Sequence, residues 1–218
     1  MLAILNLMVY IACMPMQHSF TPAQRGRPRE FDPQYVTRRA MEVFWSNGYN
    51  GTSLPDLLEG TGLSRSSLYA AYGDKRGLFL AALDQFIEDS FARIDGDLDS
   101  SRSALASLRA CLAGSVHRSA GASGKRGCMV VATAKELAGR DPDVGKRIRR
   151  FFDGFEKKLT ATLTRAREDN ELAAGIDPAD AARMLLAVTE GLRVLGKTGI
   201  DEKAWQGTVD AMIDRLRK

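Results

Sequence analysis

Two short helical segments separated by a glycine-rich turn, within Thr52 to Phe79, constrain the fold of this chain more than any other feature. Ser53 is a residue type that caps helices, and Pro55 falls in the first turn, where its missing N–H costs little. The apolar face of this first helix consists of three leucines: Leu54, Leu57 and Leu58. The glycine-containing residues 60–62 then end the helix. The pattern predicts a short helix followed by a tight turn.

A second helix follows directly and presents a polar face. Leu63, in the turn, is expected to pack between the two helices, and Ser64 is placed to cap the second one. Leu68 and Tyr72, four residues apart, point inward. The outward face then consists of Arg65, Ser66, Ser67, Tyr69 and Ala70. Such a face suits a helix in the major groove of DNA, where arginine reads guanine and hydroxyls reach phosphates or base edges. The same spacing also fits an ordinary helical hairpin with a solvated face.

The composition is that of a globular protein and argues against several classes. The chain has 218 residues, 44% of them hydrophobic, enough for one large or two small domains. Its net charge of +4 permits an anionic partner without requiring one. Three cysteines without CxxC spacing predict neither a disulfide framework nor a zinc site, and favour a reduced, cytoplasmic setting. Because GxSxG, HExxH and phosphate-loop motifs are missing, a helical enzyme is disfavoured and no cofactor or metal is expected.

The run from Leu2 to Met16 is apolar and uncharged, as signal peptides and membrane anchors are. It has no basic residue before it and is shorter than the roughly 20 residues that a spanning helix needs. We therefore predict a disordered or misassigned leader over residues 1–24, with Met14 or Met16 as the true start. The alternative is a membrane-tethered helical protein that uses this run. Under the first interpretation no stable membrane association is expected.

Arg25, Arg27 and Arg29 form a short basic arm, in which Gly26 and Pro28 prevent a helix. An extended basic arm enters the minor groove or grips phosphates in many DNA-binding proteins, although it also fits a solvated tail. Its position, directly before the helical unit, favours DNA contact.

A cationic helix start follows the polar helix. Asp74 is placed to cap a further helix, with Lys75 and Arg76 in its first turn. Cations are unfavourable beside the positive end of a helix dipole unless an anion binds there. Lys75 is therefore predicted to contact a phosphate.

Residues 25–83 resemble the DNA-binding domain of TetR-family transcriptional repressors, in the segments RGRPREFD, FWSNGYNGTS, GLSRSSLY and YGDKRGLF. The resemblance implies an all-α fold with a three-helix helix-turn-helix domain over 25–80 and a helical ligand-binding and dimerisation bundle over 81–218. It also implies DNA-contacting positions at Thr52, Arg65, Ser66, Ser67, Tyr69 and Lys75. The sequence departs from the family at Ala71, where many members carry a Tyr or His directed at the phosphate backbone.

Helical periodicity continues through the C-terminal part, including a phenylalanine-rich helix with Phe151 and Phe155. These side chains are predicted to form either the core or the wall of an apolar effector pocket, which use the same residue types. The family resemblance implies a small-molecule effector that shifts the two DNA-reading heads.

Cys128 is a second candidate for effector sensing. The basic pair Lys125 and Arg126 lies just before it, and a basic neighbour at a helix start lowers the pKa of a thiol. The family resemblance implies that a cysteine of the effector domain can sense electrophiles or oxidants, and Cys128 is the candidate for this role, with Cys111 as a weaker one. The alternative is a small buried hydrophobic residue.

The last two helices are predicted to form a dimer interface. The helix that begins at Asp177-Pro178 is apolar on nearly all sides, so its own core and a second surface must both cover it. The final helix carries one apolar stripe. The predicted dimerisation residues are Leu185, Leu192, Trp205, Val209, Met212, Ile213 and Leu216. Together these helices resemble the two-helix dimer interface of the family, which implies a homodimer on a palindromic double-stranded operator.

Overall fold

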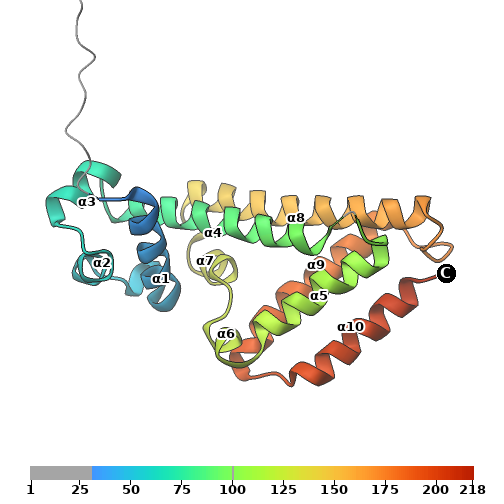
Figure 1. The fold of residues 1–218 in the computed structure, drawn as a ribbon. Helices are drawn as coiled ribbons and strands as arrows, with labels where there is room; N and C mark the ends of the chain where they lie inside the picture. Colours follow the sequence, from blue (N-terminus) through green and yellow to red (C-terminus); the bar gives the residue numbers. More distant parts are fainter. Residues whose placement is uncertain (1–30, 100) are drawn as a thin grey trace, which may run out of the picture. The chain divides into compact units, whose positions relative to one another are not determined.

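The computed structural model describes residues 31–99 and 101–218, and this part of the chain is built from α-helices (Figure 1). They are α1 (Pro33–Gly51), α2 (Leu54–Thr61), α3 (Arg65–Tyr72), α4 (Lys75–Asp97), α5 (Ala104–Ser119), α6 (Gly121–Arg126), α7 (Met129–Leu137), α8 (Pro142–Glu168), α9 (Pro178–Leu195) and α10 (Glu202–Leu216), with a 3₁₀ turn, η1 (Gly196–Thr198), after α9. The all-α prediction is confirmed. β-type pairing in the described residues is limited to an isolated bridge between Leu172 and Arg217.

The predicted leader, residues 1–24, and the basic arm lie outside the described residues. Within residues 31–99 and 101–218, no helix combines the length and the apolarity needed to cross a lipid bilayer.

Hydrogen-bonded caps fix the boundaries of α2 and α3. The Ser53 hydroxyl accepts from the Asp56 N–H, and the Asp56 carboxylate accepts from the Ser53 N–H, which makes a reciprocal capping box. Gly62, with a φ of 72°, ends α2 in the left-handed region. Ser64 then caps α3 by accepting from the N–H of Ser67. The two helices therefore begin and end where the sequence pattern predicts.

The helix α1 is broken at Gly48, whose φ of 74° is a conformation that glycine adopts without strain. The break lies within the segment FWSNGYNGTS. It frees the N–H groups of Tyr49 and Asn50, and both donate to the carboxylate of Glu136 on α7, at 3.1 and 2.7 Å. A side chain from far along the sequence thus completes the end of α1.

The head, defined here as residues 33–80, packs around a small core. Phe44 and Phe79 meet edge to face with ring centroids 5.0 Å apart, and both are buried. Leu57 of α2 and Leu68 of α3 are fully buried. The core therefore draws one or more side chains from each helix of the head, and this fixes how α3 is presented.

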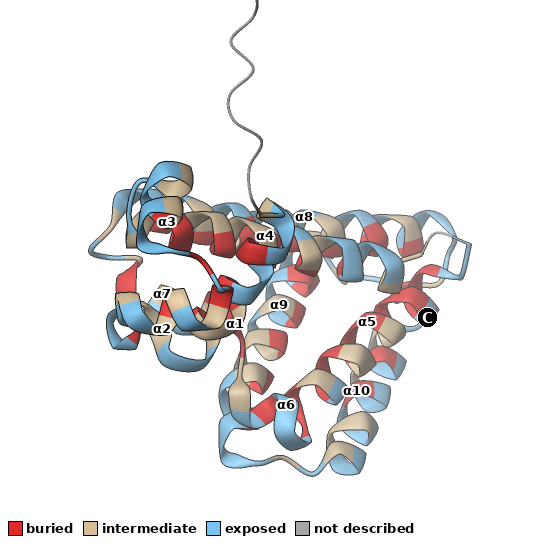
Figure 2. Cartoon of the chain, turned by 60° about the vertical axis from the view of Figure 1, so that its left-hand side comes forward, coloured by how far each residue is buried: buried red, intermediate tan, exposed pale blue. Residues whose placement is uncertain are grey.

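The long helices α4 and α8 lie side by side and run in the same direction (Figure 1). Ion pairs tie them at two levels, from Arg147 to Asp84 at 3.0 Å and from Lys158 to Asp95. Figure 2 shows buried residues along α4, α5 and α9, with exposed residues on their other sides. Since α4 begins in the head and continues into the C-terminal bundle (residues 81–218), it connects the two mechanically.

Arg76, in the first turn of α4, is bound by the start of α8. Its guanidinium donates to both carboxylate oxygens of Asp141, at 2.8 and 2.9 Å, and to Asp143 at 2.8 Å. The hydrogen bonds from Arg76 lower the pKa of Asp141 to about 2. Asp141 also caps α8 by accepting from the N–H groups of Asp143 and Val144. One carboxylate therefore both starts α8 and holds the head.

Phe151 and Phe155 are 2% and 1% exposed and stack with other rings, with Phe91 and Phe151 5.6 Å apart at their centroids. They line neither of the two cavities described below. Of the two interpretations of these phenylalanines, the structure supports core packing.

Phe155→Ala should lower the free energy of unfolding by about 3–5 kcal/mol, because it removes a buried ring and leaves a cavity. Phe152→Ala, on the same helix but only half-buried, should cost clearly less. Urea unfolding followed by circular dichroism measures both. Equal costs for the two variants would contradict the packing described here.

Asp141→Asn should destabilise the protein near neutral pH, because asparagine keeps the cap but loses the charge that binds Arg76. A carboxyl with a lowered pKa stabilises the fold fully above its ordinary value of 3.8, and loses this effect as the pH falls toward 2. The difference in urea midpoint between the variant and the wild type should therefore shrink between about pH 4 and pH 2. Asp153→Asn, at an exposed position of the same helix, serves as the control. A difference that stays constant over this range would refute the role given to the charge.

Candidate nucleic-acid interface

The helix α3 is anchored on one side and exposed on the other. Leu68 is fully buried, and the Tyr72 hydroxyl lies 3.2 Å from the Thr37 hydroxyl. The exposed residues of α3 are Arg65, Ser66, Tyr69 and Ala70, and Ser67 is half-buried. Tyr69 is 46% exposed, so a large part of its ring is accessible to a partner. The structure thus brings the predicted residues of α3 to one surface, where DNA contact stays a prediction.

A cluster of hydroxyls lies at the start of this surface. The Ser64 hydroxyl is 2.9 Å from that of Ser66 and 2.8 Å from that of Ser67. Hydroxyls at a helix N-terminus donate readily to phosphate oxygens, which the helix dipole also attracts. The cluster therefore suits contact with a phosphate backbone, beside the exposed side chains of Arg65 and Tyr69.

Lys75 is held in place beside Tyr49. Asp74 caps α4 by accepting from the Gly77 N–H at 2.7 Å. Gly77 is required there, because a Cβ atom would lie 1.9 Å from the carbonyl oxygen of Tyr72. The Lys75 ammonium lies 4.4 Å from the centroid of the Tyr49 ring, in a cation–π contact. Since the carboxylates of α8 bind Arg76, Lys75 is the cation at this helix start that stays available for phosphate.

The remaining predicted DNA contacts are Thr52 and the arginines of the basic arm. Thr52 is 1% exposed, and its hydroxyl donates to the Gly48 carbonyl at 2.6 Å. Its side chain supports the break in α1 and is not part of the exposed surface, so we leave it out of the proposed contacts. Arg25, Arg27 and Arg29 lie outside the described residues.

The predicted activation of Cys128 is wrong. The thiol is 5% exposed at the start of α7, and burial raises its pKa instead of lowering it. Of the basic pair before it, Lys125 is exposed, and Arg126 stacks on Trp45 with its guanidinium carbon 3.8 Å from the ring centroid. Burial also raises the pKa of Cys111, to about 12. A raised pKa disfavours the thiolate form, so a sensor role for these cysteines gains no support from the structure and stays a prediction.

An exposed apolar stripe runs along the outer side of α9. Met184, Val194 and Leu195 are 67%, 55% and 44% exposed, and they are among the few large hydrophobic side chains so exposed in the described chain. Met184 and Leu195, eleven residues apart, lie on one face about three turns from each other, with the half-exposed Val188 and Gly191 between them, and Val194 lies beside this face. This stripe is the kind of surface that a partner covers.

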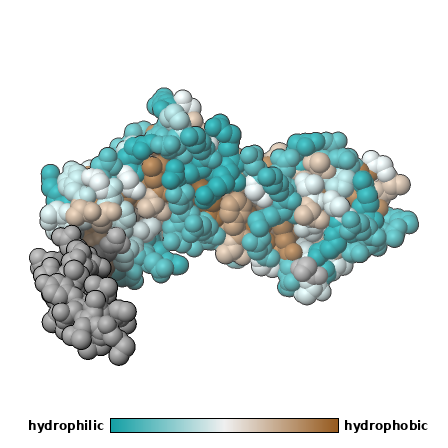
Figure 3. Space-filling view, turned by 90° about the horizontal axis from the view of Figure 1, so that it is seen from above, coloured by the Kyte–Doolittle hydropathy of each residue, from teal (hydrophilic) through white to brown (hydrophobic). Residues whose placement is uncertain are grey.

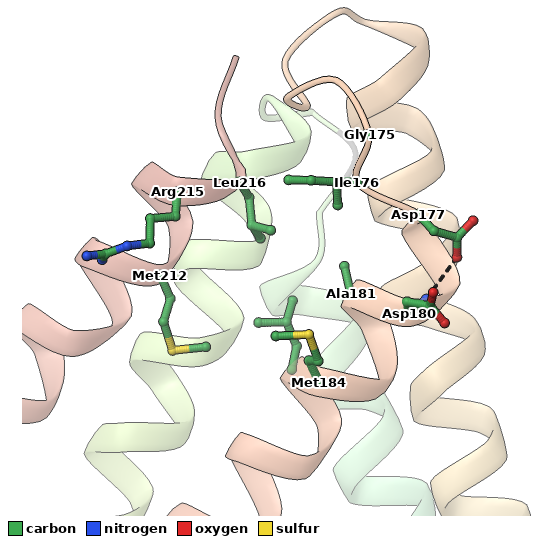
Figure 4. Close-up of a pocket in the computed structure, with 10 residues that line it drawn as sticks. Gly175, Ile176, Asp177, Asp180, Ala181, Met184, Met212, Arg215 and Leu216 are labelled. Atoms are coloured by element: carbon green, nitrogen blue, oxygen red, sulfur yellow. Dashed lines mark hydrogen bonds between the residues drawn. The ribbon is translucent and has the colours of Figure 1, made fainter.

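A groove of about 430 Å³ lies beside the stripe, between α9 and α10. Met184 from α9 and Met212 from α10 face it, and Leu216 and Ile176 lie at its end (Figure 4). Seen from the side of α4 and α8, by contrast, hydrophilic side chains predominate, with separate hydrophobic areas between them (Figure 3).

The structure separates the predicted dimerisation residues into two groups. Trp205, Met212 and Leu216 are half-exposed on α10. The others are 0–3% exposed and belong to the core of the protomer, where α9 packs on α5 and α8 and α10 packs on α5: Leu185, Leu192, Val209 and Ile213. For these four residues the prediction that they lie in the dimer interface is wrong. Helical periodicity identifies an apolar face, but it does not show whether a helix of the same protomer or a partner covers that face.

Sequence reasoning missed the residues that join the head to the bundle. Glu136 of α7 and Asp141 before α8 bind groups of the head that lie 65 to 87 residues earlier. A lone glutamate on a helix has no local signal for such a role. Only the N-cap position of Asp141, just before a proline, pointed to part of its function.

Comparisons with known proteins agree with this arrangement. The sequence model of the "Bacterial regulatory proteins, tetR family" matches residues 36–82, and the "Tetracyclin repressor-like, C-terminal domain" matches residues 104–212. The uncharacterised HTH-type transcriptional regulator YezE of Bacillus subtilis (strain 168) is 32% identical over 88% of this chain and 99% of its own length. The HTH-type transcriptional repressor ComR of Escherichia coli (strain K12) is 30% identical over 80% of this chain and 84% of its own.

A solved structure is similar over nearly the same span. A cysteine mutant of the TetR-family regulator CifR, in complex with 26 bp double-strand operator DNA, has a TM-score of 0.73 and 30% identity, and covers 88% of this chain and 100% of its own. The two matched domains, the full-length relatives and the shared fold lead to one conclusion: the chain belongs to the TetR family of helix-turn-helix transcriptional regulators.

Proposed function

We propose that this protein is a homodimeric repressor that binds a palindromic DNA operator through α3 and is released from it by a small-molecule effector. The observation that carries the proposal is the exposed Arg65, Ser66 and Tyr69 face on a helix whose other side is locked in a capped core. Relatives described as a repressor and as a regulator bound to operator DNA support it.

The apolar stripe on α9 supports the homodimer. A two-fold interface uses the same surface of both copies, and Met184, Val194 and Leu195 would be buried by their counterparts. The half-exposed residues of α10 would widen the contact into a four-helix arrangement. Two heads related by a two-fold axis then read two half-sites, which is why the operator should be palindromic.

The proposed contacts with DNA are the α3 residues Arg65, Ser66, Ser67 and Tyr69, together with Lys75 and the arm arginines. In this scheme Arg65 and Tyr69 reach the base edges, while Lys75 and the arm bind phosphates. The division of the chain near residue 80 into a DNA-binding and an effector-binding part belongs to the same proposal.

The cytoplasm is the proposed location, since the operator is chromosomal DNA and the described thiols are buried and unpaired. The family consists of regulators rather than enzymes, which removes the enzymatic alternative. The membrane-tethered alternative gains no support from the comparisons, and the segment that it used lies outside the described residues.

Genome-wide footprinting with the purified protein tests the proposal. It should protect a small number of two-fold symmetric sites near promoters. Protection without sequence preference, or none at all, would refute it.

Arg65→Ala and Tyr69→Ala should each weaken operator binding by about tenfold or more, because a base-reading contact contributes about 1–3 kcal/mol. Lys157→Ala, which removes one exposed charge on α8, should leave the affinity nearly unchanged. Fluorescence anisotropy with a footprinted site measures all three at one salt concentration. The assignment of α3 is wrong if both α3 variants bind like the wild type.

Met184→Arg should convert the dimer to monomer at micromolar concentration, because the interface would bury an unpaired charge. Ala161→Arg places the same charge at an exposed position of α8 and should leave the dimer intact. Sedimentation velocity over a concentration series, with circular dichroism as the check on folding, distinguishes them. A stable Met184→Arg dimer would place the interface elsewhere.

A further inference from the structure

A cavity of about 280 Å³ lies where the head meets the C-terminal bundle, and four arginines line it. They come from four separate helices: Arg93 from α4, Arg118 from α5, Arg126 from α6 and Arg193 from α9. Asp89 is the carboxylate among the lining residues, and it accepts a hydrogen bond from Gln85. The lining therefore carries an excess of positive charge.

The carboxylates around the cavity neutralise these arginines unevenly, and of the four only Arg126, through Glu42, has a close ion-pair partner among the described residues. Arg118 lies 3.5 Å from Asp97, and Arg193 lies 3.8 Å from Glu190, both long for ion pairs. Arg93 forms no ion pair with any described residue and donates to the Ser90 hydroxyl at 2.8 Å. Partial burial and the nearby charge of Arg118 lower the pKa of Arg93, a sign that like charges crowd there.

Several polar atoms near the cavity are buried without a hydrogen-bond partner in the described structure. They include the Nε atom of Arg126. The Nε atom of Arg193 and the Glu190 carboxylate also lack a hydrogen bond, but they face each other at 3.8 Å. Leaving a buried charged donor unsatisfied is costly, so such atoms commonly mark a place where a ligand or water binds. Burial raises the pKa of Glu190, while the charge of Arg193 acts in the opposite direction.

Part of the lining is apolar, and the guanidinium of Arg126 stacks on its Trp45 ring. Met41 and Trp45 reach it from α1, and Phe86 reaches it from α4. Trp45 and Phe86 meet edge to face, with ring centroids 4.9 Å apart. The volume is slightly below the roughly 300–1,000 Å³ range of drug-sized sites, so a compact ligand fits best.

We propose that this cavity binds a small organic anion, whose carboxylate or phosphate group pairs with the arginines while its apolar part packs on Trp45 and Phe86. An anion supplies the acceptors that the guanidinium groups lack and offsets their mutual repulsion.

The cavity is placed to change the position of the head, which connects this inference to the proposed function on which it rests. Arg126 of α6 pairs with Glu42 of α1, and the Trp45 indole donates to the Gly127 carbonyl at 3.1 Å. An anion that binds Arg126 competes with Glu42 for the same guanidinium. It therefore favours a state in which the contact between α1 and α6 is loosened, which is the differential affinity that an effector needs.

Intrinsic fluorescence gives a direct test in the full chain. The chain has two tryptophans, so Trp205→Phe leaves Trp45, in the cavity wall, as the reporter. Benzoate and phenylacetate are titrated at constant ionic strength against their neutral amides, and inorganic phosphate is titrated as a third probe. At least one carboxylate should change the fluorescence saturably and bind at least tenfold more tightly than its amide.

The variant Arg93→Gln should weaken binding of that carboxylate at least tenfold. Arg93 is only partly buried, and among the described residues its side chain hydrogen-bonds a serine hydroxyl alone, so the fold should survive the substitution. If it does not, Arg118→Gln replaces it. Arg149→Gln, at an exposed position of α8, is the charge-matched control and should bind normally.

Three results would overturn the proposal: no saturable response to either carboxylate, equal binding of carboxylate and amide, or unchanged binding in the arginine variant. Inorganic phosphate that binds as tightly as the carboxylate would refute the role given to the apolar part of the lining.

Operator affinity is measured separately, with and without the carboxylate. If the protein binds the operator normally but does not respond to the carboxylate, this inference is refuted and the proposed function is not. If the protein does not bind an operator, the proposed function is refuted, whatever the fluorescence titration shows. The bound carboxylate should lower operator affinity in the wild type and not in Arg93→Gln.

Discussion

The burial of α4 in two cores at once is the interaction on which the rest of the structure depends. Leu78 and Phe79, near its start, pack in the head, while Ile87 and Ile94 are buried in the C-terminal bundle. Because one continuous helix holds both sets, the head cannot separate from the bundle without exposing apolar surface. A movement of the head must therefore be a tilt carried by α4, with the polar contacts around it exchanged for others.

Those polar contacts are suited to exchange. Glu136 holds the broken end of α1, Asp141 holds Arg76, and Arg126 pairs with Glu42. Each lies partly at the surface, where an ion pair typically contributes about 0–1 kcal/mol. Together they set the resting position of the head, while an effector with modest differential affinity is enough to replace one of them. Arg126 belongs both to the arginine-lined cavity and to the ion pair with Glu42, so the proposed anion would act directly on a contact that holds the head.

The cysteines show why neighbouring residues mislead when burial is unknown. Lys125 and Arg126 precede Cys128 in the sequence, yet Lys125 is exposed and Arg126 stacks on Trp45. The thiol itself is buried at the start of α7, and desolvation outweighs the charges around it. Residues that are neighbours in sequence need not face one another. Here Lys125 and Arg126 end α6, Cys128 lies at the start of α7, and the turn between the two helices points their side chains to different surroundings.

The sequence by itself determined the local elements and the exposed polar face of α3. Caps such as Ser53, Ser64 and Asp74 and the glycine at position 62 act through hydrogen bonds and backbone angles within a few residues, so their effect is legible without the fold. Tertiary structure decided which apolar faces are core, since Leu185 and Met184 are adjacent in sequence but 3% and 67% exposed. It also decided that Thr52 supports α1 internally and that four arginines from distant helices share one cavity. Burial and long-range electrostatics depend on which segments pack together, and no spacing rule within a single segment encodes that.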